Sequence, residues 1–281
     1  MPHASPSSDL PSRAASLAAR YGAGAMPAAG PWNEVVAGLL AHRSVRAYRP
    51  DPLPPGTLET LVAAAQSAAT SSNLQSWSVV SVENPATRAE LARIANGQRH
   101  IEQCPLFLVF VADLSRNRRL GARAGAGLEG LDFLETFLVA AIDAALAAQN
   151  AVVAAESLGL STVYIGALRN DPAAVATLLG LPAEAMGVFG LCVGHAAPGG
   201  EGEVKPRLPQ EAILFRERYD TAAEPGLVAA YDPRMEAFSR RNEMSASGWS
   251  GRVIARVRDA AALSGRDRLT AILRGLGFRL R

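Results

Sequence analysis

The feature that most constrains the fold is a long apolar segment from Gly130 to Leu160, GLDFLETFLVAAIDAALAAQNAVVAAESLGL. Its length and composition predict one helix, with Gly159 where a helix commonly ends. Because it is apolar nearly all round, the helix belongs at the centre of a core or at a subunit interface. Its polar residues would be costly in lipid, so we expect a buried helix of a soluble protein rather than a membrane span.

Shorter patterns surround this segment. Apolar or β-branched runs predict five strands, over 76–83, 105–113, 161–166, 187–196 and 212–219. Apolar residues at helical spacing predict helices over 32–43, 57–70, 84–96 and 171–180, followed by three helical segments after residue 226. Because helices and strands mix without regular alternation, the sequence favours the α+β class, with helices packed on a small sheet.

The composition excludes some classes of protein. The chain has 281 residues and a formal net charge of +2, whereas nucleic-acid binders usually carry a basic stripe. Cys104 and Cys192 stand in apolar surroundings without CxxC spacing, which indicates buried thiols in a reducing cytosol. No apolar signal-peptide core is visible. We therefore expect a cytoplasmic protein that binds neither nucleic acid nor membrane.

The N-terminal residues 1–30 differ from the rest of the chain. They are rich in Ala, Ser, Pro and Gly, which predicts a flexible arm, with room for a short helix over 13–21. We expect residues 31–281 to form a single domain.

The chain lacks the usual motifs of hydrolases and metal-dependent enzymes. A GxGxxG match at 125–130 follows the basic stretch RNRRLGARA, which we take for a loop, rather than a strand. It therefore does not indicate a dinucleotide-binding fold. The histidines His3, His42, His100 and His195 show no metal-like spacing. We expect no metal site.

Three separated stretches carry side chains suited to an anion joined to a polar ring. HRSVR at 42–46 holds two arginines, which we expect on one face of a helical turn. TSSNLQ at 70–75 holds five neutral hydrogen-bonding side chains. VKPRLP at 204–209 holds Lys205, the only lysine of the chain, and Arg207, which point the same way from an extended segment. Arginine forks and a lysine charge suit phosphate oxygens, although each stretch alone is also compatible with a solvated helix end or a capping loop.

In their order and spacing these stretches resemble the FMN-containing, NADPH-dependent nitroreductase and flavin reductase family, of its larger oxygen-insensitive type. The resemblance rests on HRSVRAY, SAATSSNLQSWSVV and GVFGLCVGHAAPGGEGEVKPRLP, with two further blocks between them. It covers about residues 34 to 255. It implies a nitroreductase-like α+β fold, a mainly antiparallel central sheet flanked by helices, in an intertwined homodimer with FMN at the interface. The segment 226–281 would be a helical extension that wraps the partner subunit.

The resemblance also assigns roles to residues of this chain. The cations of the first and third stretches would serve the FMN phosphate, and Arg46 would reach the pyrimidine edge of the flavin. The segment 164–167 would pass the ring near N5, with Ala167 where the family usually has Gly. The whole FMN-binding set that it implies is His42, Arg43, Ser44, Val45, Arg46, Thr70, Ser71, Asn73, Gln75, Gln98, Tyr164, Ile165, Gly166, Ala167, Lys205 and Arg207.

The implied activity is that of an FMN-dependent NAD(P)H oxidoreductase. A hydride would pass from NADPH through FMN N5 to a nitroaromatic, a quinone or free flavin, in a ping-pong cycle. Because the cofactor carries the chemistry, no catalytic side chain is expected, and Arg46 would stabilise the reduced flavin. A flavin-binding or flavin-supplying partner or sensor with little turnover stays open as an alternative.

The preference for NADPH would depend on a mobile loop. Arg240 and Arg241 match the position at which the family grips the 2′-phosphate of NADPH. Ser245 and Ala246 stand where further arginines are expected. A solvated helix end is the other interpretation of the two arginines.

Overall fold

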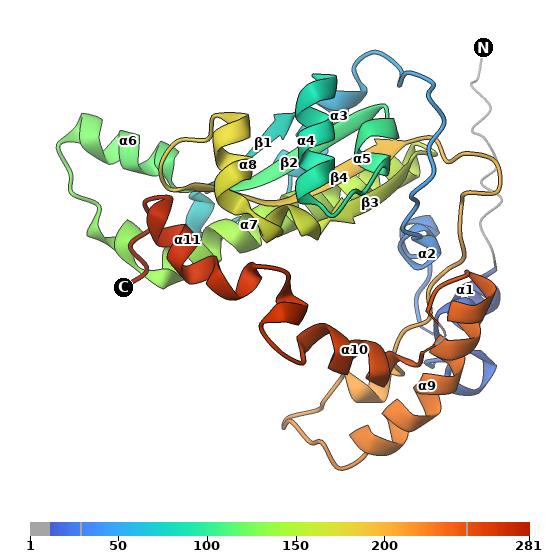
Figure 1. Cartoon of the computed structure of the whole chain (residues 1–281). Coiled ribbons are helices and arrows are strands. Elements are labelled where there is room, and N and C mark those ends of the chain that lie inside the picture. Colours follow the sequence, from blue (N-terminus) through green and yellow to red (C-terminus); the bar gives the residue numbers. More distant parts are fainter. Residues whose placement is uncertain (1–11, 29, 246) are drawn as a thin grey trace. The chain divides into compact units, whose positions relative to one another are not determined.

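The computed structural model describes residues 12–28, 30–245 and 247–281. The chain divides into two compact units. The helical unit comprises residues 1–43 and 202–258, and the sheet unit comprises residues 44–201 and 259–281. Figure 1 labels the elements of both.

The sheet unit is built on an antiparallel sheet in the order β1-β2-β4-β3. Its strands are β1 Trp77–Ser81, β2 Leu106–Asp113, β3 Ser161–Ile165 and β4 Ala185–Gly194. Every residue of β2 is buried, since it lies between β1 and β4 and is covered on both faces. The predicted antiparallel sheet flanked by helices is confirmed.

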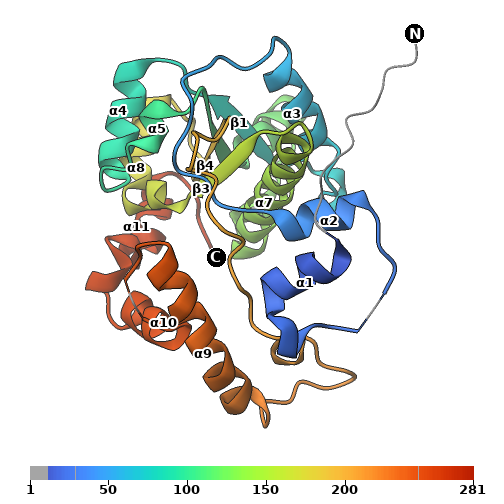
Figure 2. The ribbon, with the colours of Figure 1, turned by 90° about the vertical axis from the view of Figure 1, so that its right-hand side faces the viewer.

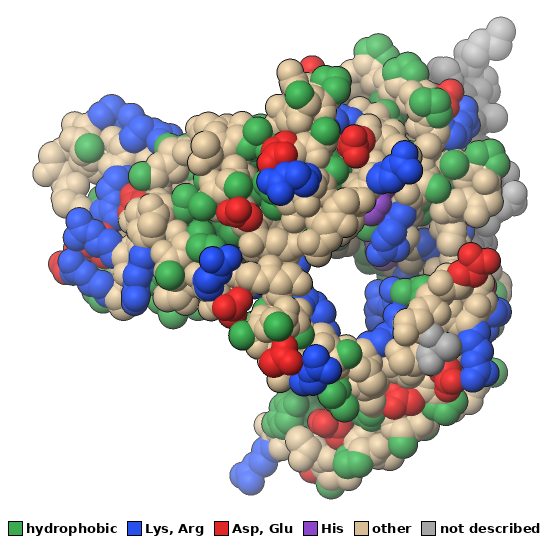
Figure 3. Space-filling model, in the orientation of Figure 1, with side chains coloured by type: hydrophobic (Ala, Val, Ile, Leu, Met, Phe, Trp, Pro, Cys, Tyr) green, Lys and Arg blue, Asp and Glu red, His purple; other side chains and the backbone are tan. Residues whose placement is uncertain are grey.

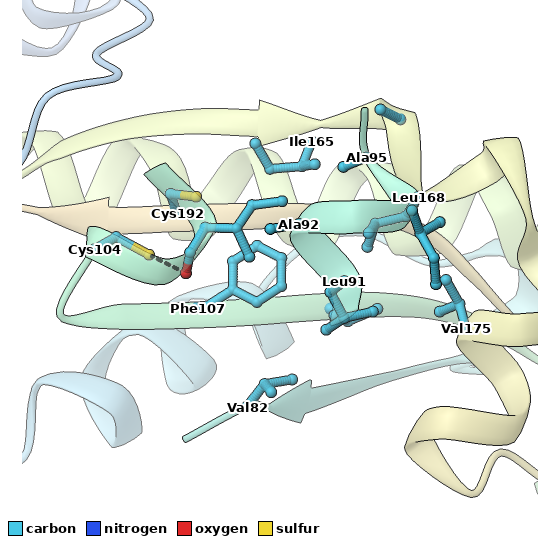
Figure 4. Packing of buried hydrophobic residues seen from close by; sticks show 14 of the residues in the cluster. Val82, Leu91, Ala92, Ala95, Cys104, Phe107, Ile165, Leu168, Val175 and Cys192 are labelled. Carbon is cyan, nitrogen blue, oxygen red and sulfur yellow. Dashed lines mark hydrogen bonds between the residues drawn. The ribbon is translucent and has the colours of Figure 1, made fainter. Parts of the chain in front are cut away.

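Helices cover both faces of this sheet (Figures 1 and 2). One layer contains α4 Pro85–Ile94, α5 His100–Gln103 and α8 Pro172–Leu179, and the other contains α3 Thr57–Gln66 and α7 Leu134–Ser157. Successive residues of β2 serve the two layers in turn, because Phe107 belongs to the buried cluster with α4 and α8 and Leu108 to the cluster with α3 and α7. Figure 4 shows Phe107 among Leu91, Ala92 and Leu168. Gly190 makes room for this ring, since a Cβ there would lie 2.5 Å from the Phe107 Cζ.

The two cysteines lie in the same layer as Phe107 (Figure 4). Cys104 and Cys192 are buried free thiols, as predicted. Cys104 Sγ donates to the Ile101 carbonyl at 3.6 Å. Burial raises the pKa of the Cys192 thiol well above its ordinary value.

The helix α7 confirms the long helix expected from the sequence. Its alanine-rich face packs on the sheet, with Ala144, Ala147 and Ala151 almost inaccessible to solvent. By length and composition α7 could span a membrane, with a mean hydropathy of 1.7 over its most apolar stretch, of which 39% is buried inside the protein. The opposite face exposes large apolar side chains, namely Leu134, Leu138, Ile142 and Leu146. α7 is thus a core helix with a second, unpartnered apolar face.

The C-terminal part of the sheet unit packs on its own chain. In α11, Leu269–Gly275, Leu273 joins Phe278 in a cluster with Leu131. Figure 3 shows basic side chains gathered over this end and over α6, Ser115–Ala124. Several are paired with carboxylates: Arg118 with Glu184 and Asp132, Arg279 with Asp132, and Arg281 with Glu129. The expectation that 226–281 wraps a partner subunit stays a prediction.

The helical unit has a smaller core. It contains α1 Arg13–Tyr21, α2 Glu34–Ala41, α9 Glu224–Arg241 and α10 Trp249–Val257, and in Figure 2 α1 lies against α2 and α10 against α9. Its apolar centre consists of Tyr231, Met235 and Phe238, with Leu208 and Trp249 packed against them. The short helix expected within the N-terminal arm is confirmed as α1. Residues 1–11 of that arm lie outside the described residues.

The structure corrects three local predictions. The strand expected over 212–219 is wrong: a 3₁₀ turn at Gln210–Ala212 is followed by irregular chain, in which Glu217 has a left-handed φ of 61° and Ile213 is 67% exposed. The basic stretch before Gly125 is not a loop but the helix α6. The helix α2 ends at Ala41, so the two arginines of the 42–46 stretch do not share a helical turn.

Candidate functional site

The helical unit brings together predicted residues from both ends of the chain. The Arg20 guanidinium donates to the carbonyls of His42 at 2.6 Å and Lys205 at 2.9 Å. The backbones of the first and the third predicted stretch therefore both lie within reach of the Arg20 side chain. Arg43 lines a cavity of about 520 Å³ together with Val204 and Pro206.

Arg43, Lys205 and Arg207 form the cation cluster of the helical unit, and each is held in a different way. Arg43 is exposed and makes no hydrogen bond or ion pair with any residue that the structure describes. The Lys205 ammonium lies 5.8 Å from the centroid of the Phe238 ring, which favours a cation there. Arg207 donates to the Lys205 carbonyl at 3.2 Å, and the Tyr231 hydroxyl donates to Pro206 at 2.8 Å. The segment is thus fixed through its backbone, and its two cations belong to the same compact unit as Arg43, which favours an anionic ligand in that unit.

The two arginines predicted for NADPH lie at the end of α9 in the same unit. Arg240 pairs with Glu236 at 2.6 Å and Arg241 pairs with Glu203 at 2.9 Å. Arg241 also lines the cavity. Because all four side chains are between 37% and 68% exposed, these pairs are weak and either arginine can exchange its carboxylate for a phosphate.

The sheet unit holds the continuation of the first stretch. From Ser44 the chain is extended along β3, where the Val45 amide donates to the Thr162 carbonyl at 3.0 Å. Val45 is 3% exposed and lies in the core, whereas Arg46 is exposed and donates only to the Ser44 carbonyl, at 3.4 Å, among the described residues. An extended chain alternates its side chains between two faces. Val45 is therefore an anchor that turns Arg46 outward.

The polar stretch between α3 and β1 forms a constrained loop. Ser72, Asn73 and Gln75 all have a left-handed φ, between 48° and 54°, a conformation that costs free energy in residues with a side chain and that often marks ligand sites. Asp143 of α7, which is 1% exposed, accepts the amides of Ser71 at 3.2 Å and Ser76 at 3.3 Å. The loop therefore presents exposed hydroxyl and amide groups from a fixed backbone.

The remaining predicted residues lie at the end of β3 and near α5. Tyr164 donates its hydroxyl to Gln149 at 3.3 Å, and burial raises the pKa of this phenol. Ile165 and Ala167 belong to the same buried cluster as Val45. The Ala167 methyl group therefore packs in the core, and only 8% of the residue is exposed. Gly166 and Gln98 are half-buried. The backbone carbonyl of Gln98 accepts the Ile101 amide at 3.1 Å.

Sequence reasoning did not select two residues that hold these groups, Asp143 and Arg20, nor the buried His100 near Arg46. Asp143 could have been found, because a lone carboxylate inside an apolar helix needs partners when it is buried. Arg20 gives no such signal within a stretch of low complexity. His100 is buried, its Nε2 has no hydrogen-bond partner among the described residues, and burial together with the charge of Arg46 lowers its pKa.

Comparisons with known proteins agree with this picture. The model of the nitroreductase family matches residues 39–195, and the model of that family's C-terminal domain matches residues 205–281. The chain belongs to the nitroreductase family. It is 38% identical to the "NADPH-flavin oxidoreductase" of Vibrio harveyi over 223 residues, which are 79% of this chain and 90% of the relative. It is 36% identical to the "FMN reductase (NADPH)" of Bacillus subtilis over 227 residues, which are again 79% and 90% of the two chains.

Solved structures of nitroreductase family members are similar as well. The NADPH:FMN oxidoreductase from Vibrio harveyi complexed with NAD+ matches with a TM-score of 0.79 and 34% identity, over 89% of this chain and 100% of that chain. Nitroreductase A from Vibrio parahaemolyticus matches with a TM-score of 0.81 and 33% identity, over the same shares. The family resemblance inferred from the sequence motifs is confirmed.

Proposed function

We propose that this chain is an FMN-dependent oxidoreductase that uses NADPH as its reductant. Two relatives that share more than a third of its residues over most of their length are named as NADPH-flavin oxidoreductase and FMN reductase. A third, 36% identical over 87% of its length, is named oxygen-insensitive NADPH nitroreductase, from Salmonella typhimurium. The observation that carries the proposal is that the chain combines this family membership with the cation cluster of its helical unit.

The residues present fit FMN. A phosphate needs cations on a fixed backbone, and the Arg43, Lys205 and Arg207 set supplies them. A flavin ring and its ribityl chain need neutral hydrogen-bonding groups, and the Asp143-anchored loop supplies them through Thr70, Ser71, Asn73 and Gln75. When bound, FMN supplies two-electron transfer between a nicotinamide and an acceptor.

The residues of the chain would then bind the FMN phosphate, orient the flavin ring and stabilise its reduced form. His42 and Ser44 would complete the phosphate contacts, and Arg46, turned outward by its buried neighbour, would place a positive charge at the pyrimidine edge of the flavin. The backbone of 164–167 would lie along the ring, with Gln98 near the ribityl chain or the ring. No side-chain nucleophile is required, because the cofactor carries the chemistry.

The 2′-phosphate of NADPH would be bound by Arg240 and Arg241. Both are exposed arginines that end α9, and both are held by carboxylates on the surface. Exposed pairs of this kind contribute at most about 1 kcal/mol, so a doubly charged phosphate competes well with the carboxylate. This supports a preference for NADPH over NADH.

The protein would act as a cytoplasmic homodimer with FMN at the interface. The exposed apolar face of α7 supports this, since Leu134, Leu138, Ile142 and Leu146 are each 44–55% exposed and repeat at four-residue spacing. An apolar stripe on one face of a helix that already packs its other face in a core is typical of a subunit interface. Small-molecule acceptors, such as nitroaromatics, quinones and free flavin, would be the only further partners.

An anaerobic titration tests the proposed function. The purified protein should carry FMN, NADPH should bleach the flavin absorbance, and a quinone or a nitroaromatic should restore it. Steady-state rates with both substrates varied should give the parallel lines of a double displacement. A flavin that binds but that NADPH does not bleach would contradict the proposal and favour a flavin-supplying partner or sensor.

A further inference from the structure

Arg20 of α1 is a buried arginine whose fork reaches three separate carbonyl groups. It is 6% exposed. Its Nε donates to the Leu40 carbonyl at 2.8 Å, its Nη1 to the Lys205 carbonyl at 2.9 Å and its Nη2 to the His42 carbonyl at 2.6 Å. All four residues belong to the helical unit. One planar group therefore ties the end of α2 to a segment that lies far along the chain.

The main chain of Arg20 adds to this link. Its carbonyl accepts the Arg207 amide at 2.8 Å and the Arg234 guanidinium at 3.5 Å. The residues bonded to Arg20 thus include His42, Lys205 and Arg207, which are predicted to serve a phosphate, and Arg43 follows His42 directly.

We propose that Arg20 is a positioning residue that fixes the spacing of the phosphate-binding cations. The inference rests on the proposed function, because it takes the FMN phosphate as the anion that these cations bind. Like charges held close together repel each other, so without a bound anion the two stretches tend to separate. The neutral carbonyls that Arg20 holds keep the backbones of both stretches in place before the anion arrives. Arg20 acts through these backbones, and no contact of its own with the cofactor is required.

Only an arginine can make this set of bonds. Its nitrogens form a rigid fork that points in three directions, whereas a lysine carries a single nitrogen on a flexible stem. A lysine at position 20 keeps the charge and loses the fork. The pair of variants therefore separates positioning from simple electrostatic attraction.

The position of Arg20 also makes it a feature of this chain beyond the matched family region. The family model begins at residue 39, after α1 has ended at Tyr21. The same helix forms one wall of the cavity that Arg43 lines, through Ala18 and Ala19. The helix α1 is therefore part of the framework of this cavity.

The test compares the binding of FMN with that of riboflavin, which has the same ring and no phosphate. The full chain is freed of flavin, and each dissociation constant is measured by quenching of flavin fluorescence. Arg20→Met should raise the dissociation constant of FMN by about tenfold or more and that of riboflavin by less than about threefold, because the loss concerns charged phosphate contacts. Arg20→Lys should behave like Arg20→Met. Arg13→Met is the matched control on the same helix, since the Arg13 side chain makes no hydrogen bond or ion pair with a described residue.

The outcomes separate the possible failures. If Arg20→Met weakens FMN and riboflavin by equal factors, Arg20 merely supports the fold and the inference is overturned. If Arg20→Lys matches the unmodified protein, charge alone acts, and the inference is again overturned. If Lys205→Ala leaves the ratio of the two affinities unchanged, the phosphate site itself is misassigned. A loss of FMN preference in Lys205→Ala without one in either Arg20 variant would contradict only the role of Arg20.

Discussion

The two units of this protein are stabilised in different ways. The sheet unit has three buried apolar clusters, in which Phe107, Leu91 and Ile101 are fully inaccessible. The helical unit has one small cluster around Tyr231 and Phe238. There, much of the order comes from arginine side chains that donate to backbone carbonyls.

This difference corresponds to a difference in proposed roles. Apolar packing gives a rigid platform, and the sheet unit carries the residues assigned to the flavin ring, Arg46 and the 70–75 loop. Hydrogen-bonded arginines gather positive charge without a large core, and the helical unit carries the cations assigned to the phosphate, Arg43, Lys205 and Arg207. The comparison teaches that the sheet unit depends on apolar packing and that the cations of the helical unit depend on hydrogen bonds. A substitution in one unit should therefore leave the property of the other unit intact.

The largest expected effect concerns the core of the sheet unit. Phe107→Ala should lower the free energy of unfolding by about 3–5 kcal/mol, because it removes a fully buried ring and leaves a cavity. Leu120→Ala, at a residue that is 59% exposed, should change it by less than about 0.5 kcal/mol. Urea unfolding of both variants checks this. Equal effects of the two changes would mean that β2 is not the centre of the core.

The second effect concerns the buried carboxylate beneath the polar loop. Asp143→Asn should lower the free energy of unfolding by about 2 kcal/mol, since an amide offers one acceptor oxygen for two backbone donors. We also expect weaker binding of riboflavin, because the loop is assigned to the ring. Calorimetry and flavin titration measure the two quantities. If Asp143→Asn changes neither the proteolysis of the loop nor the affinity for riboflavin, Asp143 does not hold the loop in its binding conformation.

A smaller effect is expected for the end of α9. Arg240→Ala should raise the KM for NADPH by about tenfold, through the loss of one charge-assisted contact, and leave the KM for NADH nearly unchanged. Arg216→Ala, an exposed arginine of the same unit, serves as the control and should change neither value. A rise that is the same for both nicotinamides would show that Arg240 does not bind the 2′-phosphate.

The smallest effect is a dependence of stability on pH. The pKa of His100 is lowered from its ordinary value of 6.5 by burial and by Arg46, so the folded protein binds its proton less well than the unfolded chain. The contribution of this histidine to stability is therefore complete above about pH 6.5 and is lost as the pH falls below it. His100→Leu should flatten the acid side of the stability curve measured by thermal unfolding. A curve that stays as steep as before would assign the acid loss to other groups.

The fold was largely predictable from the sequence, and the site only in part. The alternating and continuous apolar patterns of β2, β4 and α7 gave strands and a helix that the structure confirms, because burial imposes a period on the residue types. The run at 212–219 has the composition of a strand and forms none; it belongs to the helical unit, whose described residues contain no strand for it to pair with. The hydrogen bonds of Arg20 and Asp143 join residues far apart in sequence. They impose no periodic pattern on the sequence, so they could not be predicted from it.

The most direct measurement is the pair of dissociation constants for FMN and riboflavin in variants of the two units. Arg43→Ala and Lys205→Ala, in the helical unit, should each weaken FMN by about 2 kcal/mol through loss of a charged phosphate partner, with riboflavin binding unchanged. Arg46→Ala, in the sheet unit, should weaken both flavins by the same factor. If Arg43→Ala and Lys205→Ala both keep the ratio of FMN to riboflavin affinity of the unmodified protein, the assignment of the phosphate to the helical unit is contradicted.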